Sequence, residues 1–108
     1  MEKKLKAKWV KALRSKEYKQ GTGRLRNADT NEYCCLGVLC DISGLGNWKI
    51  GLDGSYYKYE EHGRAGVLVP KLLKVVGLIE AEQANLYNLN DDDGKDFYEI
   101  ADYIEENL

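Results

Sequence analysis

The first sixteen residues combine lysines with apolar side chains at the spacing of an amphipathic helix. The apolar members recur on one helical face: Leu5, Trp9, Ala12 and Leu13. This spacing predicts a helix over residues 3–16. Gly21 and Gly23 end the pattern.

Short extended patterns follow in two places. Residues 24–27 predict a strand, 28–31 its turn and 32–34 a partner strand. Further on, apolar residues alternate with others from Trp48 to Leu52, and tyrosines alternate again at positions 57 and 59. Asp53-Gly54 lies between the two runs and is the strongest short hairpin signal in the chain.

Two helices are predicted around and after these strands. Residues 35–42 are mostly apolar on all sides, which predicts a short buried helix that ends at Gly44. Gly37 inside it costs about 1 kcal/mol relative to alanine, so we expect another backbone to approach it closely. Pro70 is suited to the first turn of a helix that ends near Val76, with Gly77 just beyond.

The last part of the chain predicts a short helix over residues 82–89 and a clearer one that begins at Asp96. Asp96 and Glu99 have the spacing of a capping box. An apolar stripe follows at Phe97, Ile100, Ala101, Ile104 and Leu108. We expect the acids at 91–93 to lie ahead of this helix, where its dipole favours them.

Together these elements predict one α+β domain over residues 1–108, with a small antiparallel sheet of hairpins packed against N-terminal, central and C-terminal helices.

Length and composition exclude some classes of protein. A chain of 108 residues with 44% apolar and 31% charged residues is typical of one globular domain. The longest apolar run, residues 34–40, is too short to cross a bilayer, and no hydrophobic segment of a secretory signal follows the first lysines. We therefore expect a cytoplasmic protein, and neither a membrane protein nor a multidomain enzyme.

Charge divides the chain into two opposed parts. Residues 1–26 carry ten basic and two acidic side chains, a formal charge of +8. The other residues carry six basic and sixteen acidic side chains, which brings the total to −2. This asymmetry predicts either an anionic partner for the basic end or docking of the two ends on each other. The acidic total argues against duplex DNA as that partner.

Three cysteines lie within seven residues: Cys34, Cys35 and Cys40. Their odd number and close spacing favour reduced thiols. Their spacing does not fit a zinc site, and His62 is the only histidine, so we expect no metal. A thiol at a helix N-terminus has a lowered pKa, so Cys34 or Cys35 with His62 as base is a candidate catalytic pair. The favoured interpretation is that the cysteines are small buried hydrophobic residues.

The segment from Tyr18 to Arg26 is the main candidate site. Gly21 and Gly23 would let the backbone approach a ligand. If residues 24–26 form a strand, Arg24 and Arg26 share one face about 6.8 Å apart and can hold phosphate or carboxylate in a concavity. The alternative is an ordinary turn and a solvent-exposed strand. The expected ligand-binding residues are Tyr18, Gln20, Gly21, Gly23, Arg24, Arg26 and Tyr57, the last of which can stack on a base.

Four segments resemble a widespread family of small proteins encoded by tailed bacteriophages: Tyr18-x-Gln20-Gly-x-Gly-x-Leu-Arg26, Tyr33-Cys-Cys-Leu-Gly-Val-Leu-Cys-Asp41, Leu89-Asn-Asp91 and Phe97-x-x-Ile-Ala-Asp-Tyr-Ile-Glu105. The middle of the chain, residues 46–85, has no counterpart in this resemblance. The resemblance implies a phage context and no defined activity. Small phage proteins of this kind often act against host defences, some by sequestering nucleotide-derived signals.

The leading hypothesis is a non-enzymatic phage accessory protein in the host cytoplasm. It would bind a small anionic, nucleotide-type ligand without a cofactor and sequester a host immune signal. Two alternatives stay open: a protein-interaction module whose basic helix inhibits a host factor, and a cysteine-dependent hydrolase. A second copy of the chain is a further possible partner.

Overall fold

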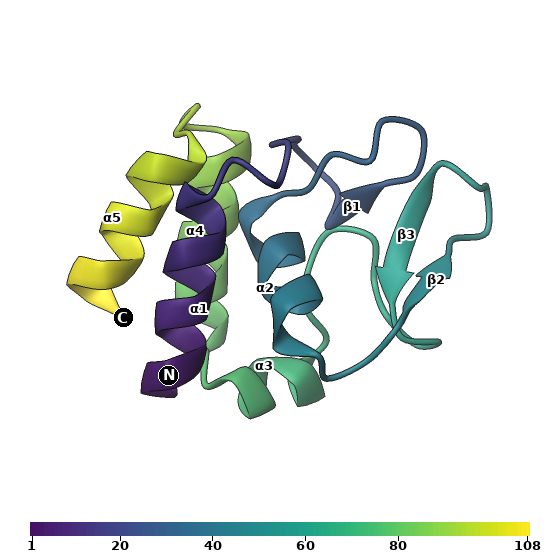
Figure 1. Ribbon diagram of the computed structural model, residues 1–108. Coiled ribbons are helices and arrows are strands. Elements are labelled where there is room, and N and C mark those ends of the chain that lie inside the picture. Colours follow the sequence, from purple (N-terminus) through teal and green to yellow (C-terminus); the bar gives the residue numbers. More distant parts are fainter.

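Five helices and three short strands follow one another in the computed structural model, which describes all residues 1–108 (Figure 1). In chain order they are α1 (Lys3–Arg14), β1 (Arg26–Asn27), α2 (Cys35–Ser43), β2 (Trp48–Ile50), β3 (Tyr56–Tyr59), α3 (Pro70–Val76), α4 (Glu80–Asp91) and α5 (Phe97–Asn107). The strands form one antiparallel sheet, and the helices come from the N-terminal, central and C-terminal parts of the chain. The predicted α+β class is confirmed.

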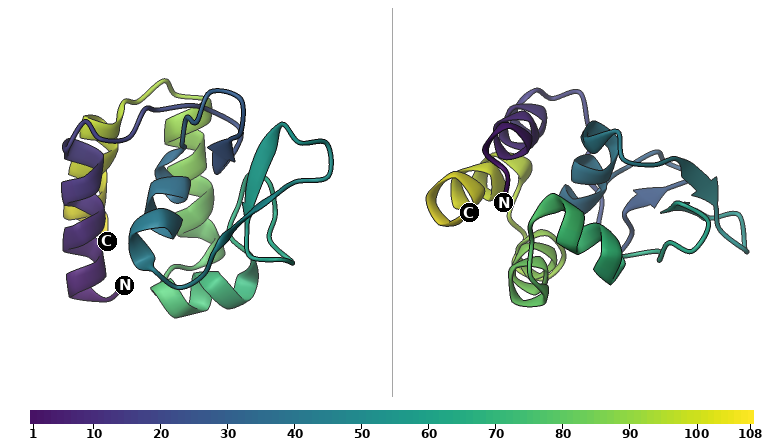
Figure 2. Two further views of the ribbon diagram at one scale, coloured as in Figure 1. Left: turned by 45° about the vertical axis from the view of Figure 1, so that its right-hand side comes forward. Right: turned by 90° about the horizontal axis from the view of Figure 1, so that it is seen from below.

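The helices gather at one end of the molecule and the sheet lies at the other, with α2 between them (Figure 1). α1 packs against α5 and α2, and α2 also packs against α4. Both chain termini lie at the helical end in both views of Figure 2. No helix has both the length and the apolar character needed to cross a membrane.

The core is one contiguous cluster of apolar side chains, centred on the apolar faces that the sequence pattern predicts. Trp9 of α1 and Ile104 of α5 are fully buried. All apolar positions of α2 from Cys35 to Cys40 are buried as well, because α2 is surrounded by other elements. Trp9 also donates a hydrogen bond from Nε1 to the carbonyl of Cys35 at 2.9 Å, so its polar atom has a partner in the core.

The sheet has the strand order β1-β3-β2. Its hairpin turns at Gly54, whose φ of 75° is the left-handed conformation that glycine adopts without strain, as the Asp-Gly signal predicts. β1 is shorter than predicted, because the amide of Leu25 donates to the carbonyl of Ala65 at 2.7 Å outside the sheet. The predicted partner strand over residues 32–34 is reduced to two isolated bridges at Tyr33.

Most helix ends follow their sequence signals. α2 and α3 end at Gly44 and Gly77, both with positive φ. Asp96 and Glu99 form the predicted capping box of α5. The expectation for the acids at 91–93 is wrong in part, because α4 continues to Asp91. These acids therefore lie at the C-terminus of α4, where its dipole does not favour them.

The two oppositely charged ends of the chain dock on each other, as one interpretation of the charge asymmetry predicts. α1 and α5 lie side by side (Figures 1 and 2). The Arg14 guanidinium contacts the carboxylates of Asp102 at 2.6 Å and Glu105 at 2.7 Å. The hydrogen bond from Arg14 lowers the pKa of Glu105.

Gly37 is the point at which the predicted close approach of two backbones occurs. A Cβ atom at position 37 would lie 1.8 Å from the carbonyl oxygen of Leu25 and 2.7 Å from its carbonyl carbon. Both obstructing atoms are backbone atoms, which cannot move aside as a side chain can. The loop before β1 and helix α2 can therefore pack together only if residue 37 is glycine.

We expect Gly37→Ala to lower the free energy of unfolding by about 1–3 kcal/mol or more, because the added methyl group overpacks the contact. In an unobstructed helix the same substitution would raise stability by about 1 kcal/mol. Urea unfolding followed by circular dichroism measures the change. Gly46→Ala is the control, because its Cβ would meet only the side chain of Glu60. An increase in the unfolding midpoint of Gly37→Ala would contradict the contact.

Candidate functional site

Five aromatic rings form a connected cluster beside the sheet. Tyr33 lies edge-to-face with Tyr18 at 5.0 Å and with Trp48 at 6.1 Å between ring centroids. Trp48 continues the series to Tyr57 at 6.4 Å and Tyr59 at 5.1 Å, again edge-to-face. Edge-to-face contacts between aromatic rings are favourable because the positive edge of one ring meets the negative face of the other. The cluster joins the loop after α1, the segment before α2, and strands β2 and β3.

The guanidinium of Arg26 lies at the centre of this cluster. Its Cζ atom is 4.4 Å from the ring centroid of Tyr57, 5.2 Å from that of Tyr33 and 5.5 Å from that of Trp48. Register explains the contact with Tyr57, because Arg26 pairs with Tyr57 across β1 and β3, and directly paired residues project from the same face of a sheet. The only side-chain hydrogen bond of Arg26 runs from Nε to Oδ1 of Asn31, at 2.8 Å.

Arg26 has no carboxylate partner. The four ion pairs of the molecule involve Arg14, Lys19 and Lys95. The terminal amino groups of the Arg26 guanidinium therefore keep their hydrogen-bond donors, while three aromatic rings hold the group in place. A guanidinium held in this way can bind phosphate or carboxylate through two parallel hydrogen bonds.

Asp41 holds two rings of the cluster from the end of α2. Its carboxylate accepts a hydrogen bond from the hydroxyl of Tyr18 and another from Nε1 of Trp48, the latter at 3.0 Å. Burial and the bond to Asp41 raise the pKa of Tyr18. Burial also raises the pKa of Tyr33. Both tyrosines therefore stay neutral at physiological pH and keep their hydroxyl protons.

Arg24 lies against a different ring from Arg26. Its Cζ atom is 4.7 Å from the ring centroid of Tyr56, the residue next to Tyr57 in β3. Neighbouring residues of a strand project from opposite faces, so Tyr56 and Tyr57 direct the two arginines to different sides of the sheet. The structure therefore does not bring Arg24 and Arg26 together as a clamp. The premise of the clamp is wrong, because Arg24 lies outside β1, which begins at Arg26.

The two glycines before the arginines differ in their surroundings: Gly21 contacts another part of the chain, whereas Gly23 faces open space. The amide of Gly21 donates to the carbonyl of Tyr33 at 2.8 Å. A Cβ at Gly21 would lie 2.7 Å from the Cβ of Glu32. Gly23 has a φ of 78° and serves the turn. Gly21 therefore lies close to another group, but that group is Glu32 of the same chain and not a ligand.

Asn90 of α4 is 2% exposed and joins three separate segments of the chain. Its Nδ2 donates to the carbonyl of Gly21 and to Oδ1 of Asp91, both at 2.8 Å. Its Oδ1 accepts from Nε2 of Gln20 at 3.0 Å and from the amide of Cys35 at 3.2 Å. The Gln20 amide is therefore occupied within the protein, which assigns this predicted ligand-binding residue to the support of the loop.

The cysteines are buried in α2 and at its N-terminus. Burial raises the pKa of Cys34 to about 12 and raises the pKa of Cys35 and Cys40. The helix N-terminus therefore does not activate Cys34 or Cys35 as predicted for a nucleophile, because desolvation of a thiolate outweighs the hydrogen bonds that would stabilise it. His62 is exposed after β3 and makes no hydrogen bond to a thiol.

The principal surface hollows lie away from both arginines. One runs along α1 beside Glu105 of α5, a second lies between α3 and the residues after β3 and includes His62, and the third lies between α4 and α5. The concavity expected around paired guanidiniums is not among them. No group of three or more His, Cys, Asp or Glu side chains is placed to hold a metal ion.

Comparison with known families places the chain in a group defined by sequence. The sequence model of one family, described as a domain of unknown function (DUF8296), matches residues 1–108, the whole chain. The chain belongs to the DUF8296 family. No curated protein and no solved structure matches it.

Three rings of the aromatic cluster are absent from the predicted ligand-binding residues: Tyr33, Trp48 and Tyr59. Asp41, whose carboxylate holds two of the rings, is absent as well. Asp41 is the one acidic residue that ends the apolar segment of α2. An acidic residue on an otherwise buried helix is a sequence signal that could have marked Asp41 as a site residue. Tyr33 and Trp48 gave no comparable signal, because aromatic residues near strands most often pack against neighbours. Only the register of β1 on β3 brings them to Arg26.

We expect Asn90→Ala to lower the free energy of unfolding by about 2–4 kcal/mol, because it leaves the Gly21 carbonyl and the Cys35 amide without a partner in a buried site. Chemical unfolding of purified protein measures this loss. Asn88→Ala on the same helix is the matched control, because Asn88 is exposed and its side chain makes no hydrogen bond. Equal stability of the two variants would show that the network is unimportant.

The cysteines should react slowly with iodoacetamide in the native protein near neutral pH. Their raised pKa values and their burial leave almost no accessible thiolate. Mass spectrometry should find no modified cysteine under conditions that alkylate glutathione completely, and three modified cysteines in denaturant. A single cysteine of the native protein that reacts as fast as glutathione would revive the hydrolase hypothesis.

Proposed function

We propose that the protein binds a small anionic ligand of the nucleotide type on the surface formed by Arg26, Tyr18, Tyr57 and Trp48. The observation that carries the proposal is the set of contacts around the Arg26 guanidinium. Its guanidinium rests on three aromatic rings and has no carboxylate partner. The chain has eighteen acidic residues with which an arginine of purely structural role could form an ion pair. None of them pairs with Arg26.

The cluster supplies the two kinds of contact that a nucleotide requires. The free edge of the Arg26 guanidinium meets the phosphate, and half-buried rings such as Tyr57 offer a surface on which a base can stack. The aromatic contacts and the Asn31 hydrogen bond already restrict the Arg26 side chain. Less side-chain entropy is therefore lost on binding than for a mobile surface arginine.

Arg24 has a secondary part in this proposal. It repeats the stacking of an arginine on a tyrosine, with Tyr56 as its ring, but on the other side of the sheet. A single phosphate on Arg26 does not need Arg24. Binding should therefore depend strongly on one arginine and weakly on the other.

We further propose that the protein is a phage accessory protein that acts in the host cytoplasm by sequestering a nucleotide-derived immune signal. The support is the resemblance of the four sequence segments, together with the location of the cluster residues within them. Tyr18 and Arg26 begin and end the first segment, and Tyr33 and Asp41 begin and end the second. Sequestration needs binding without chemistry, which suits a surface that has no activated nucleophile among its residues.

We expect Arg26→Ala to weaken the binding of a nucleotide roughly 10- to 100-fold, because charge-assisted hydrogen bonds to the ligand are lost. Isothermal titration calorimetry against a panel of cyclic and linear nucleotides measures the affinity. Arg26→Lys should restore only part of it, because lysine keeps the charge and loses the planar fork. Arg64→Ala is the control, because Arg64 is exposed and makes no ion pair.

Two results would overturn this proposal. The first is the absence of heat with every nucleotide of the panel. The second is binding that Arg24→Ala or Arg64→Ala weakens as much as Arg26→Ala does, because the ligand would then recognise overall charge and not the aromatic cluster.

A further inference from the structure

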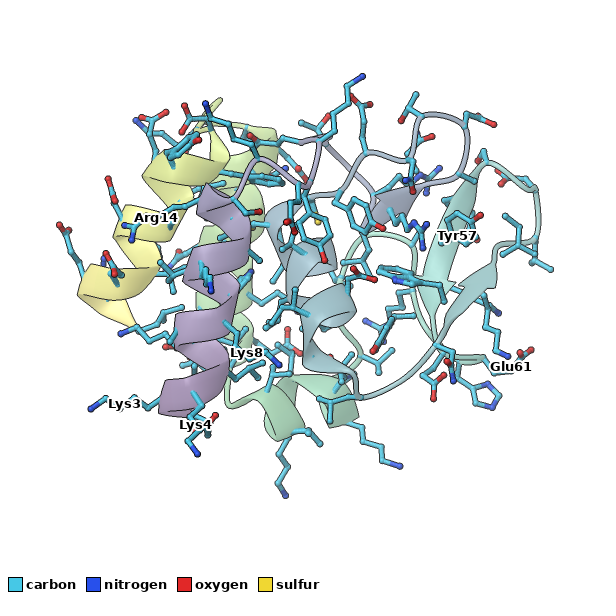
Figure 3. All side chains as sticks on the ribbon, in the orientation of Figure 1. Lys3, Lys4, Lys8, Arg14, Tyr57 and Glu61 are labelled. Carbon is cyan, nitrogen blue, oxygen red and sulfur yellow. The ribbon has the colours of Figure 1, made fainter.

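The outward faces of α1 and α5 carry opposite charges side by side, at the end of the molecule away from the sheet (Figure 1). On α1, Lys4, Lys8 and Lys11 are exposed and make no ion pair. Their spacing of four and then three residues places them on one helical face. Lys3, Lys4 and Lys8 project from α1 into solvent in Figure 3.

The face of α5 beside it is acidic. Glu99, Asp102 and Glu106 are exposed and follow one another at spacings of three and four residues, so they also share one helical face. The basic row and the acidic row each extend over seven residue steps, which is about 10.5 Å of helix. We call the two rows together the bipolar face.

The seam between the two rows is already partly neutralised within the molecule. Arg14 contacts Asp102 and Glu105 across it, and Nζ of Lys6 donates to the Glu105 carbonyl at 3.2 Å. A surface hollow follows α1 at this seam, with Ala7 and Val10 among its lining residues. The three lysines of the basic row have no partner of opposite charge. In the acidic row, Asp102 contacts Arg14 and Glu99 pairs with Lys95 at 3.6 Å, whereas Glu106 has no partner.

We propose that the bipolar face binds a second copy of this chain in a twofold-symmetric dimer. The two helices run in opposite directions side by side (Figures 1 and 2). A twofold axis parallel to them, placed over the seam, puts α1 of one copy opposite α5 of the other, and α5 opposite α1. Each basic row then faces an acidic row. A surface that is complementary to itself in this way is what an isologous dimer requires.

Other partners fit the bipolar face less well. A nucleic acid or a uniformly acidic protein that meets the lysines of α1 would also meet the acids of α5, and like charges repel. An anionic membrane would need apolar side chains on the same face of α1, but Trp9 and Leu13 are buried in the core. A partner with both signs of charge in the matching arrangement satisfies both rows, and a second copy has that arrangement.

The dimer should be weak and sensitive to salt. Ion pairs between exposed side chains contribute little individually, and dissolved ions screen them. Because the bipolar face and Arg26 lie at opposite ends of the molecule, dimerisation does not require the proposed nucleotide site and leaves it open (Figure 1). The dimer would then present two such sites.

Charge exchange between two variants tests this proposal. Lys8→Glu with Lys11→Glu gives both rows a net negative charge, and Asp102→Lys with Glu106→Lys gives both rows a net positive charge. Sedimentation equilibrium at low ionic strength should give a dimer for the unmodified chain and a monomer for each variant alone. An equimolar mixture of the two variants should form a heterodimer, because every basic row again faces an acidic one. High ionic strength should dissociate all of the dimers.

The matched control is Lys71→Glu with Lys74→Glu on α3, which changes the net charge equally at two exposed lysines away from the bipolar face. This variant should still dimerise. Circular dichroism checks the fold of each variant, and Glu99→Lys with Glu106→Lys, which keeps the Arg14 contact to Asp102, replaces the second variant if the loss of that contact unfolds it. A monomeric unmodified chain at every concentration, or a mixture that stays monomeric, would overturn the proposal.

Discussion

The hydrogen bonds of the Asn90 amide are the constraint on which the arrangement of the molecule depends. One buried side chain on α4 holds the loop at Gln20 and Gly21 and the first amide of α2. These segments carry Tyr18 and Tyr33, two rings of the aromatic cluster. A buried amide without its partners would be costly, so the three segments are ordered together or not at all. The stability of the core and the geometry of the aromatic cluster thus depend on the same hydrogen bonds of Asn90.

The sheet has few residues, yet it decides where Arg26 lies. Two-residue β1 pairs with β3, and this register places the guanidinium over Tyr57. The result is a cation held by rings and not by a carboxylate, which leaves its hydrogen-bond donors available. The same alternation of side chains along β3 sends Arg24 to Tyr56 on the other side. A shift of one residue in this pairing would place Arg26 opposite Tyr56 or Lys58, on the other face of the sheet.

Charge has a different role at each end of the molecule. At the helical end, basic α1 and acidic α5 pack together through Arg14 and leave rows of opposite sign facing outward. At the sheet end, Arg26 is an isolated cation among aromatic side chains. A formal charge of −2 for the whole chain conceals both features, because it averages over surfaces that face different surroundings. The two proposals of binding follow from where the charges lie, not from their sum.

The sequence alone determined those features that depend on near neighbours in the chain. The amphipathic faces of α1 and α5, the caps at Gly44 and Asp96, the Asp53-Gly54 hairpin and the close approach at Gly37 all follow from local periodicity and conformational preference. Only the tertiary structure decided the positions of those residues that contact distant segments of the chain. The C-terminal extent of α4 was missed because Asn90, just beyond the predicted end, is polar yet buried. The aromatic cluster was missed in part, and the arginine clamp was wrong, because strand register and the hydrogen bond from Leu25 to Ala65 are long-range contacts that no local pattern contains.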